Sequence, residues 1–302
     1  MELIKRLGLD FGNSSMKIVG GEGENIIQKR IKSLATTDSM DSNHIVEIGD
    51  KVVCFGIGTP LVTQDKTKRE HLAHSILLAT YEAYGPGSHV INLGTGLPID
   101  LYKTKKDMFE KLIRDIGDIK GDINGNKVDV VLKDIKVSAE GLAAFKAIMP
   151  EIKKDENILI VDVGLRTTDV ISASIENGKW KIDGYSTIST ALYDCYDVLR
   201  YRLFDLTDVL LTPEQLEDKI INGGTLNEID IAANYNICSE IVTDVFRRIQ
   251  LKFNDLYARK VYFLGGGAEL FNTNATFIKN KDMPKSKDKQ IYSNAVGYYL
   301  SI

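Results

Sequence analysis

Two segments of this sequence, half a chain apart, place an aspartate, a glycine and several hydroxyl side chains at matched positions. The first reads LGLDFGNSSMKIV and the second reads LIVDVGLRTTDVI, with Asp10 aligned on Asp162. Each has the pattern of a buried strand, a turn that contains glycine, and a second apolar strand, which is typical of a β-hairpin. Two unrelated hairpins with common turn residues are the alternative, but their equivalent placement favours an internal duplication.

Phosphate binding is the chemistry that such turns support. A turn rich in Gly, Ser and Thr presents several backbone N–H groups in one direction, and this nest binds phosphate oxygens. Asp10 and Asp162 would then lie beside a polyphosphate, where two carboxylates are tolerated if Mg²⁺ lies between them, held through waters. Lys17 follows Asp10 by seven residues. It either supplies positive charge to a β-phosphate or is a solvent-facing strand lysine.

A third glycine-rich segment follows an apolar strand late in the chain. Gly265, Gly266 and Gly267 come directly after residues 262–264, where the backbone must pass close to something flat or anionic. The spacing differs from the GxGxxG of dinucleotide-binding folds, and the sequence contains no GxxxxGK[ST] of the P-loop type.

The spacing of apolar residues and the turn-forming residues predict which helices and strands position these turns. Together these elements indicate two α/β halves. In the first half we expect strands over 3–9, 15–20, 24–31 and 90–93, a β-hairpin over 119–137, and helices over 68–84, 105–116 and 138–149. In the second half we expect strands over 158–161 and 261–264, a β-hairpin that turns at 177–178, and helices over 213–222, 239–257 and 294–300.

Two segments of the second half carry further local signals. Thr212, followed by Pro213 and Gln215, predicts a helix start with a capping box, and Gly223 with Gly224 predicts where that helix ends. The segment 279–290 is charged and contains a proline, so it is predicted to be a solvated loop.

Composition narrows the class of protein. The chain has 302 residues, which suggests about two domains. It carries 38 Lys and Arg against 42 Asp and Glu, a net charge of −4, which argues against direct binding to nucleic acid or to an anionic membrane. Its three cysteines show no metal-ligand spacing. Because no apolar run approaches the length of a membrane span or a secretory leader, we expect a cytoplasmic protein.

Taken in order, these segments resemble motifs of the actin-like ATPase superfamily over nearly the whole chain. Residues 9–17 look like its first phosphate motif, 160–169 like its second, and 261–270 like its adenosine motif. Three further segments are similar to the bacterial plasmid-segregation actins (ParM-like): TGLPI at 95–99, SAEGLAAF at 138–145 and NAVGYY at 294–299.

The resemblance implies an α/β fold of the actin, heat-shock-chaperone and sugar-kinase type, in which duplicated α/β domains flank a nucleotide cleft. Domain I would be residues 1–150, with a small insert at about 33–67. Domain II would be residues 151–302, with an outer subdomain at about 188–258 and a last helix that returns toward domain I.

The implied ligand is ATP or GTP with Mg²⁺. By position, Asp10 and Asp162 would organise Mg²⁺ and its waters and would be catalytic together with Glu140. The nucleotide contacts that the resemblance implies are Gly12, Asn13, Ser14, Ser15 and Lys17 of the first motif, Gly164, Leu165, Arg166, Thr167 and Thr168 of the second, Gln215 and Lys219, and Gly265, Gly266, Gly267 and Ala268 of the adenosine motif.

Three of these residues have alternative roles. Glu140 lies where the family places the residue that orients the attacking water, and a carboxylate suits that role; alternatively, it is an acid that stabilises a helix N-terminus. Leu165 and Arg166 stand where many relatives have glycine. Their side chains must therefore point away from phosphate, unless Arg166 contacts the nucleotide instead of having a solvent or interdomain role.

The implied function is a polymerising nucleotide hydrolase that forms dynamic filaments of its own protomers for plasmid or DNA segregation. It would reach DNA through a DNA-binding adaptor protein, in agreement with the acidic net charge. One alternative is a small-molecule kinase of the same superfamily, although the sequence shows no clear second-substrate motif. The other is a nucleotide-binding scaffold without turnover, against which the intact Asp10, Glu140 and Asp162 argue.

Overall fold

The structure is a computed structural model, and it separates into two compact units. The first unit comprises residues 1–150 and 292–302, and the second comprises 151–291. The residues that the structure describes are 3–22, 25–38, 42–61, 63, 65–153, 156–222 and 224–302. Gly223, expected at a helix end, and positions 39–41, 62 and 64 of the expected insert lie outside them.

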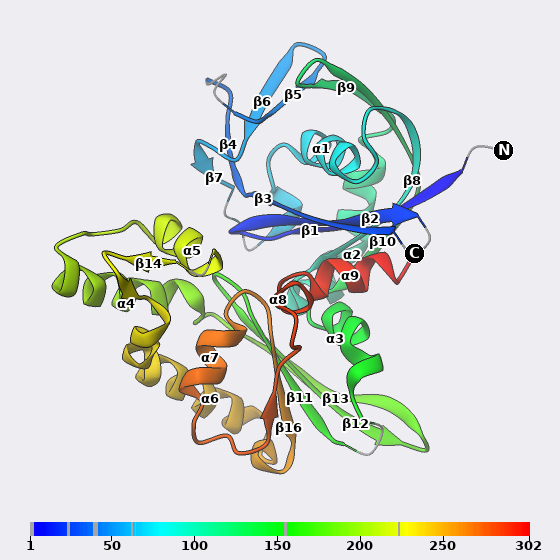
Figure 1. Cartoon of the computed structure of the whole chain (residues 1–302). Helices are drawn as coiled ribbons and strands as arrows, with labels where there is room; N and C mark the ends of the chain where they lie inside the picture. The colour runs from blue at the N-terminus through cyan, green and yellow to red at the C-terminus, as the bar shows by residue number, and fades with distance from the viewer. Residues whose placement is uncertain are drawn as a thin grey trace. The chain divides into compact units, whose positions relative to one another are not determined.

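The described part of the first unit is built on a ten-stranded sheet (Figure 1). Its strands are β1 (Ile4–Phe11), β2 (Ser15–Glu22), β3 (Asn25–Lys32), β4 (Leu34–Thr36), β5 (His44–Ile48), β6 (Lys51–Phe55), β7 (Thr59–Pro60), β8 (Gly87–Leu97), β9 (Ile119–Ile123) and β10 (Asn126–Ala139). They lie in the order β3-β2-β1-β8-β10-β9-β5-β6-β4-β7. Strands β1, β8 and β10 are parallel, whereas β2 and β3 are antiparallel to their neighbours.

Helices cover both faces of this sheet. They are η1 (Lys66–Lys68), α1 (Leu72–Tyr84), α2 (Ile99–Arg114), α3 (Leu142–Ile148), η2 (Met149–Glu151) and α9 (Ser293–Tyr299). Helix α1 packs on the face where Gly20 of β2 meets Ala83, and α9 packs on the opposite face, where Gly8 of β1 meets Tyr299 (Figure 1). Because side chains alternate along a strand, Leu7 and Leu9 point into the α1 face, and both are fully buried.

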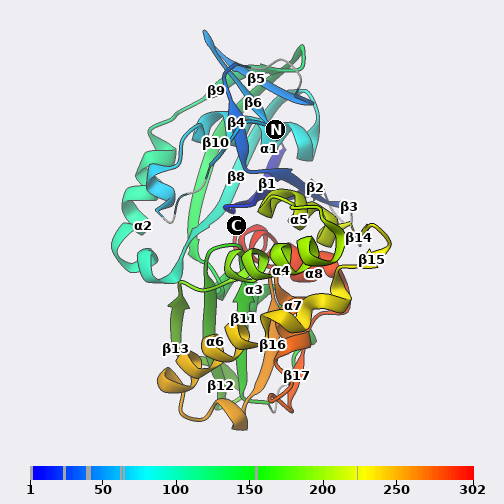
Figure 2. The ribbon, with the colours of Figure 1, turned by 90° about the vertical axis from the view of Figure 1, so that its left-hand side faces the viewer.

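The second unit repeats the core of this arrangement. Its strands are β11 (Ile158–Val163), β12 (Thr168–Glu176), β13 (Lys179–Ile188), β16 (Lys260–Leu264) and β17 (Lys281–Asp282), in the order β13-β12-β11-β16-β17 (Figure 2). Strands β11, β16 and β17 are parallel, and β12 and β13 are antiparallel. The order matches β3-β2-β1-β8-β10 of the first unit, so the duplicated α/β fold predicted from the paired hairpins is confirmed.

Helices make up most of the rest of the second unit. They are α4 (Leu192–Thr207), α5 (Pro213–Ile221), η3 (Ala232–Cys238), α6 (Ser239–Lys252), η4 (Leu256–Ala258), α7 (Ala268–Asn274) and α8 (Lys287–Ile291), with the short strands β14 (Thr225–Leu226) and β15 (Ile229–Asp230) between α5 and η3. Helix α5 begins with the predicted capping box. The Thr212 hydroxyl oxygen accepts from the backbone N–H of Gln215, and the Gln215 side-chain oxygen accepts from the backbone N–H of Thr212. Among the described residues, every helix is too short or too polar to traverse a lipid bilayer.

Some sequence-based expectations for single elements are wrong. The segment 279–290 is mostly exposed, as expected, but it is not a loop throughout, because it contains β17 and most of α8, and Gln290 is buried with its side chain donating to the carbonyl of Pro284. The helix expected from residue 138 begins at Leu142, because β10 continues to Ala139 beside β8. Over the few residues from 138 to 141, the apolar pattern of a strand end cannot be distinguished from that of the first turn of a helix.

Glycines allow α9 to pack closely on the first unit. A Cβ on Gly297 would overlap the backbone carbonyl of Ala143 in α3, and one on Gly8 would lie 2.8 Å from the backbone nitrogen of Tyr299. Backbone atoms cannot move aside as a flexible side chain can, so close packing of this kind depends on the missing side chain.

We expect Gly297→Ala to destabilise the protein by about 1–3 kcal/mol, because overpacking outweighs the gain in helix propensity. Urea unfolding followed by circular dichroism measures this change. Val296→Ala, at a half-buried position of the same helix, is the matched control and should cost less. Equal stability of Gly297→Ala and the wild type would contradict the close packing of α9 on α3.

Candidate functional site

The first predicted phosphate turn joins β1 to β2 and begins at a buried carboxylate. Asp10 is next to last in β1 and only 5% exposed, and it pairs in register with Lys17 of β2. The Lys17 Nζ donates to Asp10 Oδ2 at 3.2 Å. The lysine therefore belongs to the turn's ionic structure, and its strand-surface alternative is wrong.

Backbone and side-chain contacts fix the shape of this turn. The Gly12 carbonyl accepts from Ser33 Oγ at 2.6 Å, and the Phe11 carbonyl accepts from the buried Arg69 guanidinium at 3.1 Å. Asn13 Oδ1 accepts from the backbone N–H of Thr63 at 3.0 Å. A Cβ at Gly12 would lie 2.6 Å from the carbonyl oxygen of Ser15 and 2.8 Å from the Lys17 ammonium, so only glycine fits there.

The hydroxyls of the first turn lie against a further cation. Arg30 of β3 donates from Nε to Ser15 Oγ at 2.7 Å and from a terminal nitrogen to Ser14 Oγ at 3.2 Å. The turn thus combines a glycine, two hydroxyls and nearby cations, a composition that suits phosphate oxygens.

A lysine that sequence reasoning missed joins two of the predicted catalytic carboxylates. Lys66 of η1 is buried; its Nζ donates to Asp10 Oδ1 at 3.1 Å and also to Glu140 Oε1. The Glu140 side chain is 12% exposed. Lys66 stands in a charged stretch, QDKTKREH, with no motif of its own, and its contacts reach 56 and 74 residues along the chain.

Glu140 is positioned by the turn between β10 and α3. Its backbone N–H donates to the Leu97 carbonyl at 2.8 Å, and Gly141, at φ 73°, turns the chain into α3. The N–H of Gly141 donates to Asn294 Oδ1 of α9 at 2.9 Å. Because α3 starts at Leu142 and has no acid in its first turn, the helix-stabilising alternative for Glu140 is wrong.

The pKa values of these groups reflect burial opposed by ion pairing. Burial alone would raise the pKa of Asp10, but the ammonium groups of Lys17 and Lys66 lower it to about 2. Burial raises the pKa of Glu140 above its usual value, although Lys66 acts in the opposite sense. Burial would lower the pKa of Lys66, but the Glu140 and Asp10 carboxylates raise it.

The second predicted phosphate turn joins β11 to β12 and rests on the start of α4. Asp162 of β11 is 6% exposed. The Gly164 N–H donates to the Thr167 carbonyl at 2.9 Å, and the Gly164 carbonyl accepts from the Leu192 N–H at 3.3 Å. Thr168 is fully buried, and its Oγ1 donates to the Thr190 carbonyl at 2.8 Å.

The side chains of Leu165 and Arg166 in this turn pack against other residues of the second unit. Leu165 packs on the hydrophobic core, and its carbonyl accepts from the Tyr193 N–H at 2.9 Å. The Arg166 guanidinium lies over the Tyr193 ring, 3.7 Å from its centroid. Its Nε is buried and has no hydrogen-bond partner within the described part of the chain.

The third glycine segment folds against the second turn. Gly265, at φ 81°, donates its N–H to the Gln290 carbonyl at 2.9 Å, and a Cβ there would lie 2.5 Å from Asp162 Oδ1. The Gly267 N–H donates to the Val163 carbonyl at 3.0 Å, and Ala268 begins α7. The Asp162 carboxylate and the Gly265 turn are therefore neighbours.

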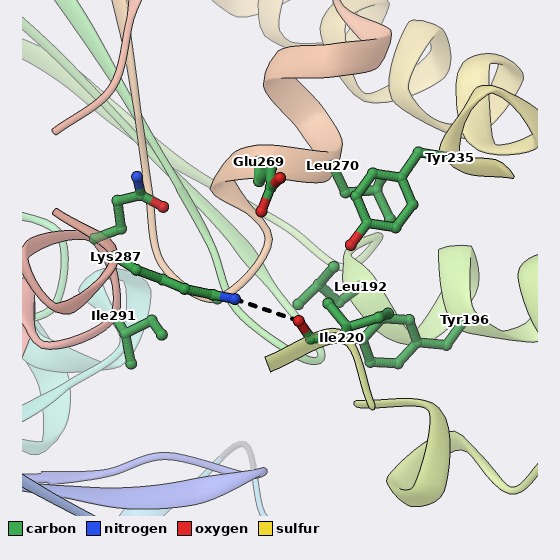
Figure 3. A pocket seen from close by; sticks show the side chains of 10 residues that line it. Leu192, Tyr196, Ile220, Tyr235, Glu269, Leu270, Lys287 and Ile291 are labelled. Atoms are coloured by element: carbon green, nitrogen blue, oxygen red, sulfur yellow. Dashed lines mark hydrogen bonds between the residues drawn. The ribbon is translucent and has the colours of Figure 1, made fainter. Parts of the chain in front are cut away.

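Next to this turn the second unit contains a pocket (Figure 3). Tyr235 of η3, Glu269 of α7 and Lys287 of α8 supply its polar groups, and the Lys287 Nζ donates to the Ile220 carbonyl at 3.2 Å. Burial raises the pKa of Tyr235, with the Glu269 carboxylate adding to the effect, so the phenol keeps its proton. The other residues that line the pocket are Leu192, Tyr196, Ile220, Gly266, Leu270, Gln290 and Ile291.

Within each unit, the structure brings most of the sequence-predicted residues together. In the first unit, Lys17 and Glu140 are joined through Asp10 and Lys66. In the second unit, only Gly266 of the predicted set lines the pocket. Gln215 is engaged in the α5 capping box, and the Lys219 Nζ donates to the Thr225 carbonyl at 3.3 Å, so neither side chain is among the pocket's lining residues.

Comparisons with known proteins agree with this architecture. A family model described as the N-terminal domain of actin-like proteins matches residues 8–142, and one described as the C-terminal part of the archaeal, MreB-like actin homologue matches 160–275. A comparison with curated proteins gave no match. The two models cover both predicted phosphate turns, and the chain belongs to the actin-like superfamily.

Solved structures of actin-like proteins share the fold at low identity. The archaeal actin homologue Ta0583 in complex with ADP has a TM-score of 0.78 at 15% identity, with 97% of each chain covered. The 15-stranded ParM filament from Clostridium botulinum has a TM-score of 0.73 at 15% identity, covering 100% of this chain and 99% of that one. Bacillus thuringiensis ParM with AMPPNP has a TM-score of 0.69 at 16% identity, covering 99% and 98%.

We expect Asp10→Asn to remove part of the acid sensitivity of folding. The pKa of Asp10 falls from 3.8 to about 2 on folding, so its stabilising contribution is complete above the unfolded value and is lost as the pH falls toward 2. Urea unfolding between pH 4 and pH 2 should therefore show a shallower pH dependence in the variant. Parallel pH profiles of the two proteins would contradict the ion pairing of Asp10.

Proposed function

We propose that this chain is a magnesium-dependent nucleoside triphosphatase of the actin-like type, which assembles into filaments for DNA segregation. The observation that carries the proposal is the ionic cluster of Asp10, Lys17, Lys66 and Glu140 at the first glycine turn, in which Asp10 and Lys66 are buried. A cluster of this kind joins a phosphate-binding turn to a carboxylate that could activate water, and hydrolysis needs both.

The residues present fit Mg²⁺ in the manner that this function requires. Mg²⁺ prefers oxygen ligands and keeps several of its waters, and Asp10 already holds two cationic groups in the structure. Among the described residues, no three His, Cys, Asp or Glu side chains gather as they would to enclose a metal. In the proposed function Asp10 and Asp162 would each contact the ion through its waters, and the ion would neutralise phosphate charge.

Each turn has a distinct task in the proposed hydrolysis. The first turn offers backbone N–H groups, hydroxyls and the Lys17 ammonium to phosphate oxygens. The second offers the backbone of Gly164–Thr168, with Arg166 held on Tyr193. Glu140 accepts a hydrogen bond from the attacking water and holds it in line, which is the positioning that such reactions depend on.

The pocket beside Gly266 is the proposed site of the nucleoside. Its apolar residues and the few polar groups at its edge are of the kinds that bind a base and ribose, and a nucleoside would enter once these side chains move apart, because the pocket has room for about one water. The similar structures with ADP and AMPPNP support an adenine nucleotide, and GTP is the competing ligand to include in any assay.

The proposals of self-assembly and DNA segregation are inferred from the proteins whose fold is similar. One similar structure is a ParM filament, which supports filaments of this chain. Because the net charge is −4, we propose that a DNA-binding adaptor protein links the filament to DNA, with no direct contact to nucleic acid.

Glu140→Gln should bind nucleotide with nearly unchanged affinity but hydrolyse it about 10²–10⁴-fold more slowly, because the amide cannot accept the proton of the attacking water. Calorimetry with ADP and ATP in the presence of Mg²⁺, together with phosphate release, measures both quantities. Glu110→Gln, on α2 and paired with Arg114, is the matched control. Unchanged hydrolysis by Glu140→Gln would remove this residue from the mechanism.

Assembly is tested by light scattering and electron microscopy of the purified protein with Mg²⁺ and either ATP or GTP. We expect filaments with one of them, and longer-lived filaments with Glu140→Gln, because hydrolysis is the step that destabilises the polymer. If the wild type binds nucleotide but forms no filaments at any concentration, the segregation function fails and a small-molecule kinase becomes the better proposal.

A further inference from the structure

The function proposed above gives no separate task to Lys66, the cation between the Asp10 and Glu140 carboxylates. The Lys66 Nζ contacts Asp10 Oδ1 and Glu140 Oε1, and its side chain is only 5% exposed. A buried charge is screened far less by water and salt than one on the surface. Its effect on any anion bound at the first turn is correspondingly large.

The structure holds this lysine in place from several sides. Asp65 caps η1 by accepting from the backbone N–H and the hydroxyl of Thr67, and it pairs with Lys105 of α2. The turn after η1 is fixed by Arg69, whose guanidinium donates to the Phe11 carbonyl and to Ser33 Oγ at 3.0 Å. Lys66 is therefore preorganised, so its charge is in position before any ligand arrives.

The charge balance of the cluster indicates what this ammonium does. Two carboxylates, Asp10 and Glu140, are balanced by two ammonium groups, Lys17 and Lys66. Without Lys66 these four groups would lose their balance, and although Arg30 and Arg69 still lie at the turn, less positive charge would remain to offset a polyphosphate, so a metal cation would be needed more. An ammonium has three N–H donors, and two of them account for the carboxylate contacts seen among the described residues.

We propose that Lys66 is a built-in counter-ion that positions Glu140 and partly replaces Mg²⁺ in neutralising the nucleotide phosphates. Nucleotide then binds appreciably before the metal does, and Mg²⁺ is needed more for hydrolysis than for binding. This inference rests on the proposed nucleotide function and adds a residue to the same site.

Lys66→Met should make nucleotide binding strongly dependent on Mg²⁺. The probe is fluorescently labelled ADP, and its Kd is measured on the full chain with excess Mg²⁺ and with EDTA. In EDTA the variant should bind at least about 10-fold more weakly than the wild type, because one unscreened charge is lost. With Mg²⁺ the difference should be smaller, so the ratio of the two Kd values rises.

Two further variants separate charge from structure. Lys68→Met changes an exposed lysine of the same short helix and should leave both Kd values unchanged. Lys66→Arg keeps the charge and should restore most of the binding in EDTA. It should restore hydrolysis less well, because a planar guanidinium holds Glu140 in a different orientation.

The double variant Lys66→Met/Glu140→Gln removes one acid together with the cation, and it replaces Lys66→Met if that protein fails to fold. It leaves Asp10 paired only with Lys17, so the cluster stays neutral, and we expect a ratio of Kd values close to that of the wild type. A wild-type ratio in folded Lys66→Met, or a raised ratio in the double variant, overturns the counter-ion role while the proposed function stands. A wild type that binds no labelled ADP under either condition overturns both.

Discussion

The ion pairs of the buried Lys66 with Asp10 and Glu140 constrain how three segments of the first unit meet. A buried ion is tolerated only when its charge is paired and its hydrogen bonds are made. The pairing of Lys66 with both carboxylates therefore requires β1, η1 and the end of β10 to meet at one point. These three segments are far apart in the sequence, and this contact ties the glycine turn after Asp10 to Glu140.

The two halves repeat one backbone pattern but differ in charge. Asp10 stands opposite Lys17 in the first hairpin, whereas Asp162 stands opposite Asp169 in the second. Asp169 accepts from Thr187 Oγ1 at 2.5 Å. The first turn carries the ion pair of Asp10 and Lys17, and in the second turn the Gly164 carbonyl accepts from the Leu192 N–H at the start of α4. The same backbone pattern thus holds different side chains in the two units.

Most of the fold could be predicted from sequence patterns that span a few residues. The site could be predicted less fully, because its contacts join residues that are far apart in the sequence. The paired hairpins, the capping box at Thr212 and the glycines after β16 are short patterns whose physical causes lie within a few residues, and the structure contains all three. Lys66 was missed because its partners are 56 and 74 residues away. Helix α8 was not predicted because its segment is mostly charged. The burial of one polar residue, Gln290, leaves no apolar pattern in the sequence.

The end of the chain also helps to define the site. Asn294 of α9 accepts from the Gly141 N–H, directly after Glu140, and α9 itself is held against β1 and α3 by the glycines at positions 8 and 297. A change that loosens α9 would therefore move the backbone next to Glu140. Packing of the last helix is thus coupled to the position of Glu140 through the side-chain amide of Asn294.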